Sequence, residues 1–137
     1  MIGLDTNMLV RYLVRDDPDQ SEQAQTAFAR FTPDCPGYVS LVTLLETVWL
    51  LRRTYKVPSD DILGTVTALV ASDAIRLQEE PTVTQAISLA RQHACDLPDA
   101  LVAVFGAACS ETLTFDRHAA QLPGMTLIPP ESNRPTP

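Results

Sequence analysis

The chain begins with MIGLDTNMLVR (residues 1–11), in which a short apolar run ends in an acid and leads into an amphipathic segment. The apolar run Met1–Leu4 is typical of a strand. Asp5 ends that run, at a position where a carboxylate favours the start of a helix. A strand that passes directly into a helix indicates a protein of the α/β class.

The same alternation continues along the chain. Strand-like segments are expected at residues 1–5, 37–39, 74–78, 112–115 and 126–128. Helical patterns cover residues 6–15, 18–31, 41–55, 82–94, 98–109 and 117–122, and another helix begins at Ser59. Strands that alternate with helices predict a single-domain α/β/α sandwich with a mainly parallel central sheet of about five strands. We expect this domain to cover residues 1–129 and the Pro-rich residues 130–137 to form a disordered tail.

Size and composition fit one compact domain. The chain has 137 residues, of which 45% are hydrophobic. No basic stretch or signal-peptide core precedes the first strand. The longest apolar run, residues 100–109, is about half of a membrane span. We therefore expect a soluble, cytoplasmic protein without a membrane partner.

The cysteines indicate neither a disulfide framework nor a catalytic nucleophile. Cys35, Cys95 and Cys109 are odd in number and form no Cys-x-x-Cys pair, so neither disulfides nor a zinc site is indicated. No pattern of His and Asn supports a catalytic cysteine. His93 and His118 are expected to be solvated or helix-face residues.

Four acids stand at the edges of apolar segments, where acids are not expected. They are Asp5, Glu46, Asp99 and Asp116. A carboxylate removed from water without a partner costs several kcal/mol or changes its protonation state. In an open α/β sheet, ligands bind beyond the carboxyl ends of the strands, where all four acids could meet. A divalent cation such as Mg²⁺ or Mn²⁺ is the natural shared counter-charge for such oxygen ligands.

Each acid also has a simpler structural explanation. Asp5 and Asp116 could cap the helices that follow them, and Asp96 with Asp99 has the spacing of a capping arrangement. Glu46 differs, because residues 41–55 are apolar nearly all round and are expected to be buried. We therefore expect Glu46 to point toward protein, with an exposed position on the helix edge as the alternative.

The charge balance is acidic, with a net charge of −7, which argues against a nucleic-acid partner unless cations offset it. The basic residues are nearly all arginine, the side chain suited to bidentate phosphate contacts. Arg11, Arg15, Arg52 and Arg53 follow shortly after the first two acids. They are candidate contacts for RNA or a protein partner, with solvated helix faces as the alternative.

Four short motifs resemble those of one known family. Residues 2–11 (IGLDTNMLVR) resemble the opening of PIN-domain proteins, in particular VapC-type toxins. Residues 40–46 precede an apolar helix as they do in that family. Residues 95–103 (CDLPDALVA) and 113–117 (LTFDR) match its later motifs in the same order. The resemblance covers nearly the whole chain except the Pro-rich tail.

The resemblance implies a metal-dependent endoribonuclease that acts as the toxin of a type II toxin–antitoxin pair, with an RNA substrate, a cognate antitoxin and a homodimer. It implies that the acidic quartet Asp5, Glu46, Asp99 and Asp116 binds Mg²⁺ or Mn²⁺ and is catalytic. Thr6, Asn7, Asp96 and Thr114 match polar positions beside these acids. Pro98 departs from the commoner small or apolar residue, and we expect it only to stiffen the helix start.

Three other functions fit parts of the pattern. A non-catalytic PIN scaffold could bind RNA or a partner without cutting it. A metal-dependent phosphatase or DNA nuclease could use the same acids. A structural protein could use them only as helix caps.

Overall fold

The computed structural model describes residues 1–129. The chain divides into two compact units, unit 1 (Met1–Glu80) and unit 2 (Pro81–Pro137). Each unit is described by itself below.

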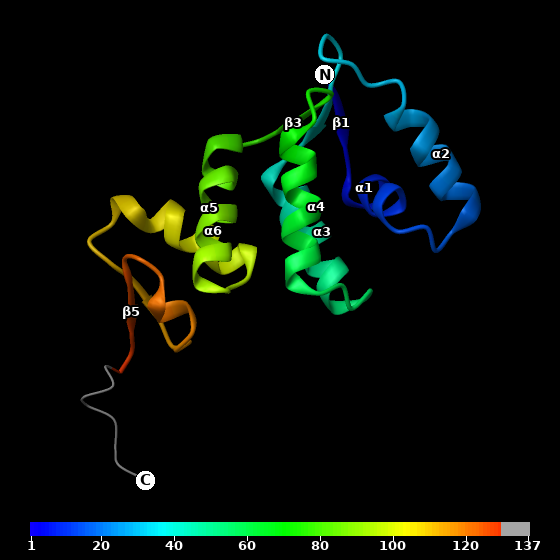
Figure 1. The fold of residues 1–137 in the computed structure, drawn as a ribbon. Helices are drawn as coiled ribbons and strands as arrows, with labels where there is room; N and C mark the ends of the chain where they lie inside the picture. Colours follow the sequence, from blue (N-terminus) through cyan, green and yellow to red (C-terminus); the bar gives the residue numbers. More distant parts are fainter. Residues whose placement is uncertain (130–137) are drawn as a thin grey trace. The chain divides into compact units, whose positions relative to one another are not determined.

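Unit 1 contains a small parallel sheet and four helices, coloured from blue to green in Figure 1. Its elements are β1 (Ile2–Leu4), α1 (Thr6–Leu13), α2 (Pro18–Phe28), β2 (Gly37–Val39), α3 (Leu41–Arg53), α4 (Ser59–Ala71) and β3 (Ile75–Leu77). The strand order is β1-β2-β3, and both pairs are parallel. Parallel neighbours require crossover connections, which helices provide here, as the sequence predicts.

Local sequence fixes where the helices of unit 1 begin. Asp5 caps α1, Asp17 caps α2 ahead of Pro18, and Ser40 caps α3 by accepting a hydrogen bond from the backbone N–H of Thr43. Helix α1 packs against α2 and α3, and α4 packs against α3 and β3. The core of unit 1 consists of apolar side chains from these elements, including Leu9, Val39, Leu44, Val48, Leu63 and Val66.

Unit 2 contains two α-helices, two short 3₁₀ helices and a pair of parallel strands within the described residues. Its elements are α5 (Glu80–His93), which starts at the unit boundary, α6 (Leu97–Phe105), η1 (Gly106–Ala108), β4 (Thr112–Thr114), η2 (Ala119–Gln121) and β5 (Met125–Leu127). Strand β4 pairs with β5. The buried side chains include Val83, Ala86, Ile87, Leu97 and Leu101.

The predicted α/β class with parallel strands is confirmed. All five expected strands are present, but they pair as a sheet of three and a sheet of two, so neither sheet has the expected five. Sequence patterns show where strands lie but not which edges pair, and this accounts for the difference. The single domain over residues 1–129 stays a prediction, and the expected tail at 130–137 lies outside the described residues.

Several helices are shorter than expected, and the helix expected at residues 117–122 is the 3₁₀ helix η2; two of the differences have identifiable reasons. Helix α6 stops at Phe105, because the chain tightens into η1 at Gly106. Helix α5 starts at Glu80, which places Pro81 in its first turn, where a missing N–H costs nothing. Among the described helices, none combines the length and the apolar character that crossing a lipid bilayer requires.

Candidate active site

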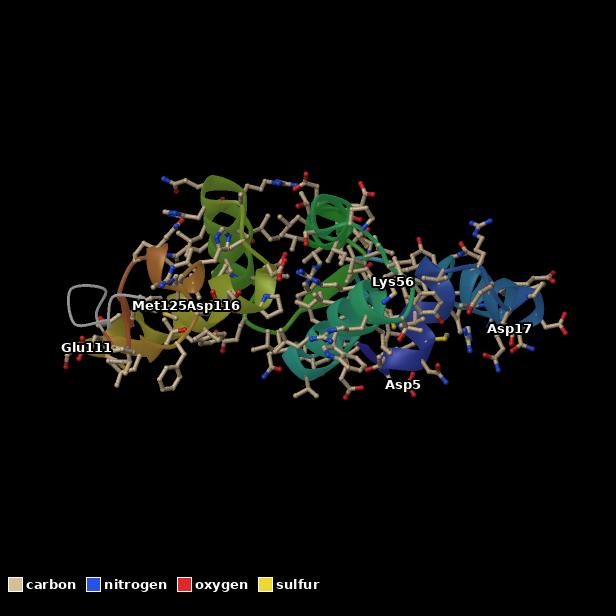
Figure 2. The ribbon with its side chains drawn as sticks, turned by 90° about the horizontal axis from the view of Figure 1, so that it is seen from below. Asp5, Asp17, Lys56, Glu111, Asp116 and Met125 are labelled. Carbon is tan, nitrogen blue, oxygen red and sulfur yellow. The ribbon has the colours of Figure 1, made fainter. Side chains whose placement is uncertain are left out.

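Asp5 lies directly after β1, at the carboxyl end of that strand, and caps α1. Its Oδ1 accepts a hydrogen bond of 2.9 Å from the backbone N–H of Met8. The side chain is exposed at the surface of unit 1 (Figure 2). Its second oxygen, Oδ2, makes no hydrogen bond within residues 1–129. The capping bond therefore uses only Oδ1 of Asp5, and Oδ2 is available to bind a ligand.

Glu46 is held near the start of α1. The hydroxyl of Thr6, the first residue of α1, donates a hydrogen bond of 3.2 Å to Oε2 of Glu46 on α3. Because Thr6 follows Asp5 in sequence, this bond places the two carboxylates on either side of one threonine. The Thr6 hydroxyl thus fixes Glu46 beside the residue that follows Asp5, and all three residues belong to unit 1.

The expectation that Glu46 points toward protein is wrong, because its side chain is exposed. The expectation that residues 41–55 are buried nearly all round is also wrong, since α3 leaves Val42 and Trp49 exposed. The reason is that two threonines occupy the buried face. The Thr43 hydroxyl donates to the Leu4 carbonyl oxygen at 3.4 Å, and the Thr47 hydroxyl donates to the Thr43 carbonyl oxygen at 2.8 Å. Their polar atoms are satisfied inside the protein, so apolar residues remain for the outer face.

Thr43 is a structural support that the sequence motifs did not single out. It is buried, with 8% of its surface exposed, and it joins α3 to the end of β1 just before Asp5. Ser40 donates to the Thr43 hydroxyl at 3.2 Å and so orients it. The sequence did contain a signal for Thr43. Ser40 and Thr43 are three residues apart, which is the spacing of a capped helix start, and both precede Glu46.

Asp116 lies just beyond the carboxyl end of β4, with Phe115 between them. Its Oδ1 accepts hydrogen bonds from the backbone N–H groups of His118 at 2.8 Å and Ala119 at 3.2 Å. The Thr114 hydroxyl accepts a hydrogen bond of 3.0 Å from the Asp116 backbone N–H. As with Asp5, the second oxygen of Asp116 makes no hydrogen bond within residues 1–129. Thr114 therefore fixes the backbone of the acid through this bond.

Asp99 lies in the first turn of α6 and is half-buried. Asp96 occupies the N-cap position of that helix, but its side chain makes no capping hydrogen bond, so the capping explanation for Asp96 fails. Both acids act on the thiol of Cys95, whose side chain is only 5% exposed. Burial raises the pKa of Cys95, and the charges of Asp99 and Asp96 raise it further. The thiol therefore stays protonated near neutral pH and is unsuited to be a nucleophile.

His118 is a further residue of this region with a role that was not expected. Its Nε2–H donates a hydrogen bond of 2.9 Å to the carbonyl oxygen of Ala94, in the turn between α5 and α6. This bond joins the turn after Asp116 to the segment that leads to Asp99, within unit 2. No sequence pattern marks it, because it depends on two segments 24 residues apart.

The comparison with known families identifies the chain. The PIN domain family model matches residues 2–124. The chain belongs to the PIN domain family. No curated protein matches the sequence closely enough to be counted as a relative. PIN domains are generally metal-dependent nucleases that act on RNA, so this PIN domain is a hydrolase at that level of description.

The PIN acids are divided between the two units of the chain. Unit 1 holds Asp5 and Glu46, and unit 2 holds Asp99 and Asp116. No three Asp, Glu, His or Cys side chains within residues 1–129 are grouped as a metal site. The quartet as one site therefore stays a prediction. Its donor chemistry suits Mg²⁺ or Mn²⁺, because all four side chains offer hard oxygen atoms.

The arginines of the PIN domain differ in the hydrogen bonds and ion pairs that they make with other side chains. Arg11 donates to Gln20 at 2.7 Å and pairs with Asp16 at 2.9 Å, while the Tyr55 hydroxyl donates to the other oxygen of Asp16 at 3.1 Å. Arg11 thus joins α1 to the start of α2, and a phosphate would have to compete with these partners. Arg52 donates to the Ser59 hydroxyl at 3.3 Å. Arg15, Arg53 and the polar residue Asn7 are exposed.

Proposed function

We propose that this PIN-domain protein is a divalent-metal-dependent endoribonuclease and the toxin component of a type II toxin–antitoxin pair. The observation that carries the proposal is the family match over residues 2–124, combined with an intact set of four acids in the family's order. The hydrogen bond that holds Glu46 to Thr6, the residue after Asp5, supports it.

We assign the following roles to the residues. Asp5, Glu46, Asp99 and Asp116 would hold Mg²⁺ or Mn²⁺. When bound, the cation neutralises the carboxylates and the phosphate and lowers the pKa of a water molecule. Asp5 and Asp116 are each oriented by capping bonds through Oδ1. Thr6 holds Glu46 in position, and Thr114 orients Asp116. RNA phosphates or the antitoxin would contact exposed arginines, with Arg15 and Arg53 better placed than Arg11, which has partners of its own.

The remaining parts of the proposal come from the VapC resemblance. A cognate antitoxin would block the site, the toxin would be a homodimer, and both would act in the cytoplasm. Expression of the toxin alone should stop growth, and co-expression of the antitoxin should restore it. Sedimentation of the purified toxin measures whether it is a dimer.

Cleavage of structured RNA tests the enzymatic proposal. Wild type, Asp5→Asn and Glu46→Gln would be compared with Mg²⁺, with Mn²⁺ and with EDTA. The matched control is Asp17→Asn, because Asp17 caps α2 as Asp5 caps α1, accepting from the Gln20 backbone N–H at 3.1 Å. Asparagine caps helices about as well as aspartate, so both variants should fold. We expect Asp5→Asn and Glu46→Gln to lose cleavage and Asp17→Asn to retain it.

The same experiment separates the alternatives. Full cleavage by Asp5→Asn, equal to that of Asp17→Asn, would show that Asp5 acts only as a cap, because asparagine replaces aspartate in that role. RNA binding without cleavage by wild type would favour the non-catalytic PIN scaffold. Faster hydrolysis of DNA or of a phosphomonoester, assayed in parallel, would replace the ribonuclease with a DNA nuclease or a phosphatase.

A further inference from the structure

Trp49 is a large aromatic side chain that the protein does not use for its core. It is the only tryptophan in the chain and is 58% exposed on α3. The buried face of the same helix is filled by Leu44, Val48 and Leu51. A tryptophan left in water has a large apolar surface available for a ligand.

The neighbours of Trp49 on the helix surface indicate what that ligand is. Glu46 precedes it by three residues and Arg53 follows it by four, spacings that bring side chains to the same side of a helix. Both neighbours are exposed. At a rise of about 1.5 Å per residue, Glu46 and Trp49 lie about 4.5 Å apart along the helix axis. The strip therefore runs from a carboxylate of the proposed site through an indole to a guanidinium.

A protein partner is a poor occupant for this strip during catalysis. Any protein surface that covered both Val42, which is 68% exposed, and Trp49 would also cover Glu46 between them. The proposed function requires Glu46 to face the phosphodiester. A nucleobase is small enough to lie on Trp49 while the neighbouring phosphate lies at Glu46. Unpaired bases stack on aromatic side chains, and arginine binds the backbone phosphates that follow.

We propose that Trp49 is a stacking platform for an unpaired base of the RNA substrate, and that Arg53 contacts the adjacent phosphate. The inference rests on the proposed ribonuclease function and adds a determinant of substrate choice to it. It requires the substrate to be unpaired beside the cleaved bond, because a base inside a duplex has no free face to offer the indole.

The fluorescence of the single tryptophan tests the platform directly. Short single-stranded RNA would be added in EDTA, so that binding is observed without cleavage. We expect RNA to quench the fluorescence and to protect the indole from acrylamide, and we expect a duplex of the same sequence to do so weakly. The variants without tryptophan would be compared with wild type by the anisotropy of fluorescently labelled RNA, and Trp49→Ala should weaken binding of the single strand by about 5- to 150-fold. Trp49→Phe should fall between Trp49→Ala and wild type.

Val42→Ala is the matched control, because it removes an exposed apolar side chain from the same helix without removing a ring. It should bind RNA as wild type does. Unchanged binding by Trp49→Ala, or equal quenching by duplex and single strand, would overturn the inference. Protection of Trp49 that rises with protein concentration without RNA would assign the indole to a contact between copies and would also overturn it. If wild type cleaves RNA but its tryptophan does not respond, only this inference fails, whereas absence of any cleavage refutes the proposed function.

Discussion

Thr6 is the side chain that holds one of the proposed metal ligands, Glu46. Its hydroxyl donates to Glu46, while its position in the chain places it next to Asp5. Glu46 is exposed, so without this bond its side chain would sample several rotamers in water. Thr6 is therefore a positioning residue, and its role depends on one oxygen atom.

Thr6→Val keeps the shape of the side chain and removes the hydroxyl. We expect Mn²⁺ affinity and RNA cleavage to fall by about 10-fold, the lower end of the effect of such supporting groups. Calorimetric titration with Mn²⁺ measures the first and gel-based cleavage the second. Thr6→Ser restores the donor and should recover most of both. Wild-type Mn²⁺ affinity in Thr6→Val would show that Glu46 needs no orientation.

Cys95 makes the free energy of unfolding change with pH in the alkaline range. Burial and the charges of Asp99 and Asp96 raise its pKa in the folded state above the ordinary value of 9.0. The folded chain then holds this proton more tightly than the unfolded chain. The contribution is complete below pH 9.0 and is lost as the pH rises through the folded-state pKa.

Urea unfolding from neutral pH to well above pH 9.0 measures this dependence. In Cys95→Ala the free energy of unfolding should fall less steeply with pH than in wild type. Cys109→Ala is the control, because Cys109 is exposed and should leave the slope unchanged. Identical slopes in wild type and Cys95→Ala would mean that another group carries the alkaline transition.

At the scale of the element, β2 packs closely against Phe31, which lies in the segment after α2. A Cβ atom added at Gly37 would lie 2.8 Å from the Phe31 ring and 3.1 Å from Ile75. Side-chain atoms do not approach this closely, so the ring would have to move. The absence of a side chain at Gly37 thus permits the packing of Phe31 over β2.

Gly37→Ala is expected to lower the free energy of unfolding by about 1–3 kcal/mol. In a Phe31→Ala background the same change should cost less, because the obstructing ring is gone. Gly64→Ala is the control, since a Cβ at Gly64 on α4 meets no atom within 4 Å. It should stabilise the protein by about 0.5–1 kcal/mol, because alanine is the better helix former. Chemical denaturation of wild type, the three single variants and the double variant provides the comparison.

The elements show where sequence reasoning succeeds and where it stops. Helix starts were predictable because Asp5, Asp17 and Ser40 are capping residues whose bonds are local. The buried face of α3 was not, because Thr43 and Thr47 become core residues only through hydrogen bonds to main-chain carbonyls. The missing capping bond of Asp96 has the same origin. Aspartate favours the N-cap position, but the surrounding structure decides whether its side chain forms the capping hydrogen bond. Strand pairing was also out of reach, because it depends on edges distant in sequence.

At the scale of the whole molecule, the four proposed ligands come from both units. Asp5 and Glu46 belong to unit 1, and Asp99 and Asp116 belong to unit 2. A bound cation would offset part of the net charge of −7.

We expect Mn²⁺ to raise the melting temperature, because a ligand that binds only the folded chain stabilises it. At about 100 times the dissociation constant the gain in unfolding free energy is about 2.7 kcal/mol. Differential scanning calorimetry of wild type and Asp116→Asn, with Mn²⁺ and with EDTA, measures it. Asp17→Asn should respond to Mn²⁺ as wild type does. The same Mn²⁺ shift in Asp116→Asn as in wild type would exclude Asp116 from the site.

The strand order β1-β2-β3 leaves β1 and β3 at the two edges of the sheet of unit 1. On β3 the exposed Arg76 lies level with Gly3 of β1, through Tyr38, and a charge of this kind discourages strands of other molecules from adding to an edge. A Cβ at Gly3 of β1 would meet no atom within 4 Å. Within unit 1, the charge of Arg76 is thus the feature that should keep the β3 edge from joining strands of another molecule in concentrated stocks.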